Sequence, residues 1–309
     1  MGSESSTRVS APGSIMMLGE HAVVYGRRAL VAAVDRRIRV TAKRRTDRRV
    51  RIQSALGEYE TELGRLEPVA PFTFALAALS AHPGELHQGF ELSIESNFPS
   101  TVGLGSSAAV TVAVIHALDV LSGAETGSSS LHERSLDAVR RVQGAGSGAD
   151  LAATVHGGVI AYRESPREWS RVNHLPPITL LYSGSKTPTP EVIRHVASRR
   201  ERDLVTHDAI FDAMDASIEP AIAALNQADW RALGSILDEN QERMRRLGVS
   251  NETLEDLVAQ LRRDDCIFGA KISGAGLGDC VVGIGIAEGY SGPHERIPVV
   301  LSTEGVRID

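Results

Sequence analysis

Several segments in the first third of the chain have the residue pattern of β-strands. Phe90–Glu95 alternates with a period of two, because its aromatic and aliphatic side chains fall on one face and its glutamates and serine on the other. Such alternation predicts a strand with one buried face. A turn at Ala11–Gly13 would join the first two strands as a hairpin. The strands predicted before residue 63 are Thr7–Ser10, Ser14–Leu18, Ala29–Val34, Ile38–Ala42, Val50–Ser54 and Glu58–Glu62.

From residue 71 onward, apolar residues at three- and four-residue steps predict helices. In the first half these are Pro71–Leu79, Val110–Leu121, Leu131–Val142 and Leu151–His156. In the second half they are Glu191–Arg202, Ala209–Gln227, Trp230–Leu247 and Glu252–Arg262. Further strands are predicted at Gly158–Tyr162, Ile178–Tyr182, Val281–Ile286 and Pro298–Ser302. Helices and strands that mix in this way indicate the α+β class.

A break in the pattern divides the chain near its middle. Arg163–Pro177 contains three prolines and several charges and has no periodicity. With 309 residues, the chain is long enough for two domains that each bury a core. We therefore expect an N-terminal domain over residues 1–165 and a C-terminal domain over residues 166–309.

Composition narrows the class of protein. Binding of nucleic acid requires a concentrated basic face, and the net charge of −6 gives no reason to expect such a partner. The two cysteines, Cys266 and Cys280, form no metal or disulfide pattern and suit a reducing cytoplasm. The N-terminal residues lack the apolar core of a signal peptide, and no apolar run is long enough to span a membrane.

A glycine- and serine-rich segment, Pro99–Ala109, lies between the strand Phe90–Glu95 and the helix that follows. Gly103 and Gly105 would let the backbone approach an anion, and the start of a helix offers unpaired N–H groups to phosphate. The segment is neither a Walker A motif nor a dinucleotide fingerprint. The structural alternative is a helix cap with small residues for tight packing.

Three further groups of polar residues stand at element junctions. Glu20 and His21 lie in a glycine-bounded turn, where surface polarity is the simpler explanation. Asp150 follows the glycine-rich turn 144–148 and could cap a helix. A third glycine-rich turn spans Gly274–Cys280. Together with Pro99–Ala109, these groups supply a phosphate cradle and a carboxylate for the attacking hydroxyl, both of which phosphoryl transfer requires.

These motifs resemble the GHMP kinases, the small-molecule kinases named for galactokinase, homoserine kinase, mevalonate kinase and phosphomevalonate kinase. The resemblance rests on three segments in the family's order: Ser10–Gly13 with Gly19–Gly26, Pro99–Ala109, and Lys271–Cys280. It implies an N-terminal half like ribosomal protein S5 domain 2, a ferredoxin-like C-terminal half, and ATP, Mg²⁺ and a small-molecule alcohol in the cleft between them. A homodimer is one alternative for the oligomeric state.

Carried over by position, the resemblance implies roles for individual residues. Asp150 would be the catalytic base or orienting group, and Ser107 would contact the metal. Glu20 and His21 would lie beside the alcohol. The ATP phosphates would be held by Gly103, Leu104, Gly105, Ser106, Ser107 and Ala108. The third turn would support the loop and substrate through Gly274, Ala275 and Gly276.

Two positions depart from the family pattern. Ser14 stands where mevalonate kinases usually have a lysine, and Val139 stands where they have a glutamate on magnesium. We expect Lys186, in the proline-braced turn 183–190, to replace the missing cation. The alternatives are Lys271, Arg140 and Arg141, and the structural alternative for Lys186 itself is a solvated lysine.

The resemblance is greatest to the mevalonate kinases, through the segment Gly19–Gly26, and implies transfer of the γ-phosphoryl group of ATP to mevalonate. The glycine turn before Asp150 also resembles phosphomevalonate kinase, so a phosphorylated acceptor is the second alternative. A third alternative, of another class, is a non-catalytic regulator that binds a nucleotide or metabolite, since two charged members of the site are absent.

Overall fold

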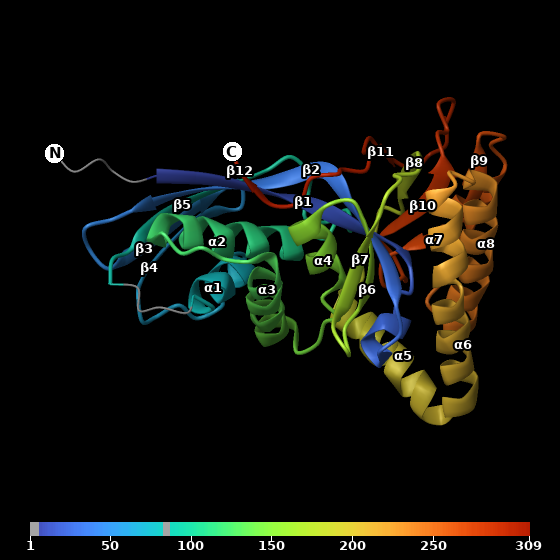
Figure 1. The fold of residues 1–309 in the computed structure, drawn as a ribbon, viewed down its shortest axis with the longest axis horizontal. Helices are drawn as coiled ribbons and strands as arrows, with labels where there is room; N and C mark the ends of the chain where they lie inside the picture. The colour runs from blue at the N-terminus through green and yellow to red at the C-terminus, as the bar shows by residue number, and fades with distance from the viewer. Residues whose placement is uncertain (1–5, 83–86) are drawn as a thin grey trace.

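The computed structural model describes residues 6–82 and 87–309. The prediction that no signal peptide is present concerns the N-terminal residues, and residues 1–5 lie outside the described range. Figure 1 shows two regions side by side, one built around a long sheet with helices α1–α4 and one built around a short sheet with helices α5–α9. Among the residues described, no helix combines the length and apolar character needed to cross a bilayer.

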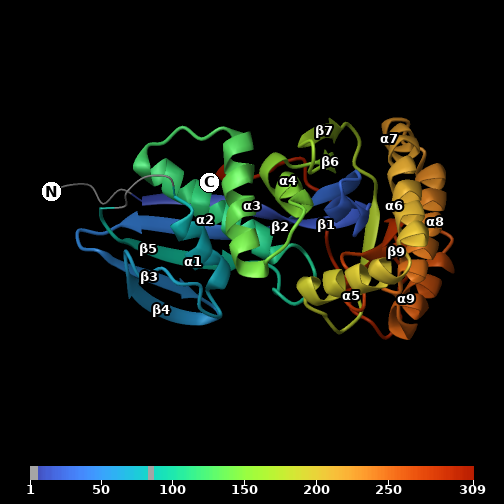
Figure 2. The ribbon, with the colours of Figure 1, turned by 90° about the horizontal axis from the view of Figure 1, so that it is seen from below.

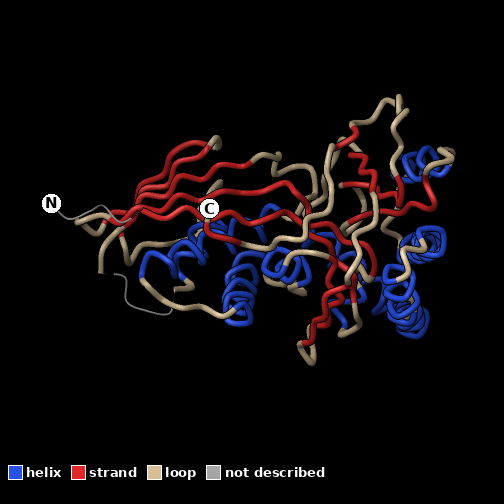
Figure 3. Tube along the Cα trace, turned by 45° about the horizontal axis from the view of Figure 1, so that its top comes forward, coloured by secondary structure: helices blue, strands red, loops and turns tan. Residues whose placement is uncertain are grey.

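The larger sheet has eight strands and carries its helices on one face (Figures 1 and 3). Its main path runs β12-β1-β2-β5-β3-β4, and β6 pairs with β2 and β7. Its strands are β1 (Ser6–Leu18), β2 (Ala29–Arg44), β3 (Arg49–Ser54), β4 (Gly57–Glu62), β5 (Phe90–Ser96), β6 (Val159–Arg163), β7 (Glu168–Val172) and β12 (Arg307–Ile308). The short 3₁₀ helix η1 (Ala22–Tyr25) separates β1 from β2, and the covering helices are α1 (Thr73–Ser80), α2 (Ser106–Ser122), α3 (Ser128–Gln143) and α4 (Ala149–His156).

The smaller sheet has four strands in the order β11-β8-β10-β9. These are β8 (Ile178–Tyr182), β9 (Ile267–Ser273), β10 (Cys280–Gly285) and β11 (Arg296–Ile297). The accompanying helices are α5 (Thr189–Arg202), α6 (Leu204–Ala216), α7 (Ile218–Asn226), α8 (Trp230–Leu247) and α9 (Glu252–Arg262). Figure 2 shows α6–α9 gathered at the far end of the molecule, with α5 running back toward the larger sheet.

The predicted hairpin at Ala11–Gly13 is wrong, because β1 continues through it as one strand paired with β2. The pairing shifts register between Pro12 and Ser14, where β2 has extra residues opposite Gly13. Gly13 serves close approach here, since a Cβ on it would lie 2.6 Å from the carbonyl oxygen of Leu104. The two strands predicted at 29–34 and 38–42 are likewise one strand, β2.

Two other predicted elements need correction, and one strand was not predicted. The helix predicted at 209–227 is two helices, α6 and α7, which are separated at Ser217. The strand predicted at 298–302 forms only an isolated bridge between Leu301 and Val34. β7 was not predicted, and it pairs with β6 although it lies within the proline-containing segment 163–177.

Two segments after residue 165, β7 and β12, belong to the larger sheet. The chain end is fixed there by Ser10, whose Oγ donates a hydrogen bond of 2.7 Å to Oδ1 of Asp309. The proposed division of the chain at residue 165 stays a prediction, and the last residues return to the first region.

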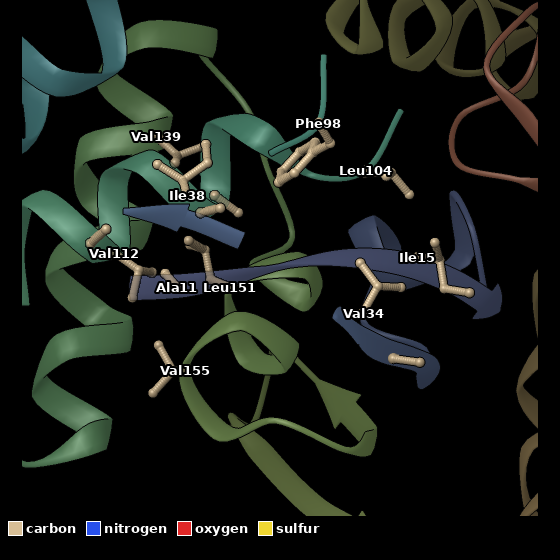
Figure 4. Packing of buried hydrophobic residues seen from close by; sticks show 14 of the residues in the cluster. Ala11, Ile15, Val34, Ile38, Phe98, Leu104, Val112, Val139, Leu151 and Val155 are labelled. Carbon is tan, nitrogen blue, oxygen red and sulfur yellow. The ribbon is translucent and has the colours of Figure 1, made fainter. Parts of the chain in front are cut away.

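Apolar side chains between β1, β2, α2 and α4 fill the main core (Figure 4). Ala11, Ile15 and Val34 from the sheet are all 5% exposed or less and pack in the same cluster as Val112 and Leu151 from the helices. Burial of such side chains contributes roughly 25 cal/mol per Å² of apolar surface. This core fixes β1 and α4 relative to each other, and both carry residues of the cleft described next.

Candidate active site

A cleft lies where the two regions meet, and three glycine-rich segments border it. The first is the phosphate-loop candidate before α2, and the second is the turn before α4. The third is the turn between β9 and β10. Most residues predicted for the site line this cleft: Glu20, His21, Gly103, Gly105, Ser106, Ser107, Ala108, Asp150, Lys186, Gly274 and Ala275.

Two predicted residues are not among those that line the cleft. Leu104 is 1% exposed and its side chain belongs to the core, while its carbonyl oxygen accepts a 3.1 Å hydrogen bond from the N–H of Ser14. Gly276 packs against Val249, whose carbonyl oxygen would lie 2.4 Å from a Cβ at position 276. Direct contact of either residue with a ligand stays a prediction.

The loop before α2 has the geometry of an anion cradle. Gly103 and Gly105 have φ angles of 69° and 62°, in the left-handed region that favours glycine. Gly105 is the N-cap of α2 and has no side-chain cap, so the first N–H groups of the helix need partners from elsewhere. Ser106, Ser107 and these N–H groups can bind phosphate oxygens.

Asp150 lies in the first turn of α4, after Gly148, whose φ of 84° turns the chain into the helix. Its Oδ1 accepts a 2.8 Å hydrogen bond from Oγ of Ser14 on β1. Burial raises the pKa of Asp150, and the Ser14 hydroxyl and the charge of Lys186 oppose that rise. The side chain therefore faces the cleft rather than capping its own helix, and its carboxylate is a stronger base than an exposed aspartate.

Ser14 and Gly105 are in direct contact. A Cβ on Gly105 would lie 2.2 Å from Oγ of Ser14, so any side chain at position 105 would displace the serine. The serine in turn holds Asp150. The missing family lysine at this position is therefore replaced by a neutral residue that joins the loop to the carboxylate.

Lys186 reaches the cleft from the segment after β8, although its side chain is exposed. Its Nζ donates a 3.2 Å hydrogen bond to the carbonyl oxygen of Ser100, at the start of the loop before α2. The positive charge of Lys186 partly offsets the rise that burial causes in the pKa of Asp150 and of Asp279. The structure thus places Lys186 at the border of the cleft, and its role as the replacement cation stays a prediction.

The other candidate cations have different partners. Lys271 is fully buried and forms an ion pair with Glu20, and it also donates to the carbonyl oxygen of Ile272. Arg140 pairs with Glu164 and donates to the carbonyl oxygen of Gly146. No lysine or arginine other than Lys186 borders the cleft within residues 6–82 and 87–309.

Glu20 and His21 connect the two regions beside the cleft. Both are buried, at 2% and 6% exposed, and His21 has a φ of 61°. Nε2 of His21 donates a 2.8 Å hydrogen bond to the carbonyl oxygen of Ala275, and burial lowers the pKa of the ring. Glu20 is held by Lys271, and Nδ2 of Asn240 lies 3.5 Å from its Oε2.

Sequence reasoning missed Asp279 as an individual site residue. It lies in the third glycine-rich turn with a φ of 65°, lines the cleft and is 4% exposed. Burial and the charge of Asp150 raise its pKa to about 6. The signal available in the sequence was an aspartate inside a glycine-rich turn, Gly278–Cys280.

Comparisons with known proteins agree with this geometry. Residues 71–158 match the GHMP kinases N-terminal domain, and residues 221–289 match the GHMP kinases C-terminal domain. The chain belongs to the GHMP kinase family. It is therefore an ATP-dependent small-molecule kinase with the family's two-domain fold.

The relatives with curated names extend along the whole chain. A mevalonate kinase of Archaeoglobus fulgidus is 35% identical and covers 97% of this chain and 99% of its own length. A mevalonate kinase of Aeropyrum pernix is 30% identical and covers 98% of both chains. The similarity to these relatives therefore extends over both regions of the chain.

Solved structures support the fold alone, because their sequence identity is low. The mevalonate kinase of Methanococcus jannaschii superimposes with a TM-score of 0.81 at 23% identity, covering 97% of this chain and 99% of its own. Lactococcus lactis galactokinase, solved with galactose, gives a TM-score of 0.84 at 18% identity, covering 98% and 95%.

Proposed function

We propose that this protein is a mevalonate kinase that transfers the γ-phosphoryl group of ATP to the primary hydroxyl of mevalonate. The observation that carries the proposal is the meeting of Asp150 and Lys186 beside the loop before α2. One supplies a carboxylate for the hydroxyl proton, and the other supplies positive charge for the phosphate. The curated relatives, which share its full length, are named for the same activity.

The cations of the cleft favour an acceptor without its own phosphate. A phosphorylated acceptor would need basic side chains in addition to those that serve ATP. Of the described lysines and arginines, Lys186 alone lines the cleft, and Arg140 is engaged by Glu164. Mevalonate has one carboxylate and neutral hydroxyls, so it needs fewer basic side chains than a phosphorylated acceptor.

ATP binds with its phosphates on the loop before α2. Backbone N–H groups at the helix start, the Ser106 and Ser107 hydroxyls and the helix dipole stabilise the negative charge. Gly103 and Gly105 are required because their positive φ angles are unfavourable for other residues. The acceptor lies between this loop and the turn that carries Glu20 and His21.

Asp150 orients the acceptor hydroxyl and takes its proton as the new bond from oxygen to the γ-phosphorus forms and the bond to the leaving ADP breaks. Its raised pKa brings the carboxylate closer to the working pH and makes it a better base. Ser14 holds Oδ1, which leaves Oδ2 for the substrate. A positioned acid–base group of this kind contributes typically 10²- to 10⁴-fold to the rate.

Lys186 stabilises the charge that develops on the transferred phosphate. It replaces the lysine that family members usually have at the position of Ser14. Its contact with the carbonyl oxygen of Ser100 holds the ammonium against the loop that binds the phosphates. If Lys186 carries this charge, the serine at position 14 does not by itself indicate a purely binding role.

The described residues fit a Mg²⁺ ion that arrives with the nucleotide. Mg²⁺ at nucleotide sites takes one or two carboxylates together with phosphate oxygens, so it does not need a complete protein cage. The described residues contain no group of three or more carboxylate, histidine or cysteine ligands. Ser107 would contribute its hydroxyl, and an unpartnered oxygen of Asp279 lies in the same cleft. When bound, the ion neutralises charge on the β- and γ-phosphates.

A coupled assay of ADP release tests the proposal. The protein is incubated with MgATP and, separately, with mevalonate, phosphomevalonate, homoserine and galactose. We expect release that depends on mevalonate and is lost in Asp150→Asn. Dependence on phosphomevalonate alone would assign the second activity, and ATP binding without turnover on any alcohol would assign a regulator.

A further inference from the structure

Three carboxylate side chains border the cleft within the described parts of the chain, and their surroundings differ. Glu20 is neutralised by the ammonium of Lys271. Asp150 accepts a hydrogen bond from Ser14 and faces the acceptor. For Asp279, Oδ1 is buried and no donor among the described residues forms a hydrogen bond to it.

Asp279 faces the loop before α2 closely. A Cβ on Gly103 would lie 2.9 Å from Oδ1 of Asp279, and a Cβ on Gly274 would lie 3.3 Å from Oδ2. The carboxylate therefore stands between the glycines of two different turns, at the place where the phosphates bind.

Backbone contacts fix this position. The N–H of Asp279 donates to the carbonyl oxygen of Ser185 at 2.8 Å, and its own carbonyl oxygen accepts from the N–H of Ser183 at 3.0 Å. Oγ1 of Thr187 donates to the carbonyl oxygen of Leu277 at 2.7 Å. The third turn and the segment that carries Lys186 are thus held together, and the φ of 65° at Asp279 is maintained by these bonds.

An unpaired carboxylate at this place conflicts with the binding of a triphosphate unless a cation lies between them. Buried charges are normally paired or coordinate metals, and Mg²⁺ at nucleotide sites takes one or two carboxylates together with phosphate oxygens. The family's glutamate is absent, because its position is Val139, whose apolar side chain borders the same cleft. Asp279 is the carboxylate that remains.

We propose that Asp279 is the carboxylate ligand of the Mg²⁺ ion that accompanies ATP, in place of the glutamate that Val139 cannot provide. The inference rests on the proposed function, since it assumes that nucleotide phosphates occupy the loop before α2. The alternative is that the ammonium of Lys186, on the neighbouring segment, balances the negative charge of Asp279.

Binding of Mn²⁺ measured by electron paramagnetic resonance separates these cases without relying on turnover. Mn²⁺ is titrated into the full-length protein saturated with a non-hydrolysable ATP analogue, for wild type, Asp279→Asn and the control Asp256→Asn. Asp256 is an exposed residue of α9 that does not border the cleft, so it controls for the loss of one negative charge. Affinity for the analogue in EDTA is measured in parallel.

We expect Asp279→Asn to weaken Mn²⁺ binding at least about 10-fold, the lower end of what metal-site partners contribute. Affinity for the analogue in EDTA should be equal to or tighter than that of wild type, because a negative charge is removed. Val139→Glu added to Asp279→Asn should recover part of the Mn²⁺ affinity. Asp256→Asn should match wild type.

Mn²⁺ affinity within two-fold of wild type in a folded Asp279→Asn protein would overturn the inference and leave Asp279 as a partner of Lys186. If Asp279→Asn does not fold, Asp279→Ser is measured in the same way and judged by the same limits. A wild-type protein that binds the analogue and Mn²⁺ but phosphorylates no alcohol would refute the proposed function and leave the metal ligand standing. A wild-type protein that binds no nucleotide would overturn both.

Discussion

Replacing Lys186 by methionine tests the compensation for the missing family lysine. The chain has only three lysines, and their environments differ completely. Lys271 is buried against Glu20, Lys43 is exposed on β2, and Lys186 borders the cleft. Methionine keeps the length of the side chain and removes the charge, so the change isolates electrostatics.

The expected loss can be worked from the position of the ammonium. Nζ lies 3.2 Å from the carbonyl oxygen of Ser100 at the edge of the phosphate loop, and the side chain is exposed. Two unit charges about 4 Å apart near a protein surface attract by roughly 4 kcal/mol at an effective dielectric of about 20. Part of this attraction already acts on bound ATP, so about 3 kcal/mol remains for the transition state, which is about 10²-fold in kcat.

Steady-state kinetics with saturating MgATP and mevalonate provide the assay. Lys43→Met is the matched control and should leave kcat unchanged. Ser14→Lys added to Lys186→Met should restore part of the rate, because position 14 is in contact with Asp150. A kcat of Lys186→Met within two-fold of wild type would refute the compensation and require another source of positive charge.

The remaining predictions concern Asp150 and the buried ion pair. Asp150→Asn should lower kcat at least about 10²-fold while the thermal shift produced by MgATP stays as in wild type; a near-normal kcat would remove Asp150 from the mechanism. In the pH profile of kcat/KM, activity should rise as Asp150 loses its proton, and this acid limb should lie above the ordinary aspartate range because burial raises the pKa of Asp150. Lys186→Met should move the limb to still higher pH, because the lysine charge opposes that rise. Glu20→Gln should lower the free energy of unfolding by about 3–5 kcal/mol by leaving Lys271 charged and unpaired, and Glu20→Gln with Lys271→Met should recover most of it; equal stability of both variants in denaturant titrations would contradict the pairing.

The sequence predicted best those elements whose pattern is decided locally. The α8 bounds, Trp230–Leu247, and the α9 bounds, Glu252–Arg262, match the prediction, because each helix has a clear apolar face and an Asp or Asn cap whose side chain accepts from the first turn. The continuation of β1 through Ala11–Gly13 depends on its pairing with β2, which extends along the strand from Ser6 to Leu18. Local turn chemistry therefore gave the wrong answer there.

The candidate site divides in the same way. The glycine-rich loop and Asp150 carried local signals and family motifs, so the sequence was sufficient to name them as candidates, and the structure places them at one cleft. The Lys271 pairing with Glu20 joins residues 251 positions apart, and no local pattern contains that information. Asp279 was hidden for another reason, because its significance is the absence of a partner, and only the packed structure reveals which of the cleft carboxylates is unpaired.

The most direct test of the central claim is ³¹P nuclear magnetic resonance of the products formed from ATP and mevalonate. The account predicts equal amounts of ADP and a new phosphomonoester on the primary oxygen of mevalonate, formed by wild type and not detectably by Asp150→Asn over the same period. Free inorganic phosphate in place of the phosphomonoester, or a phosphomonoester formed equally fast by both proteins, would contradict it.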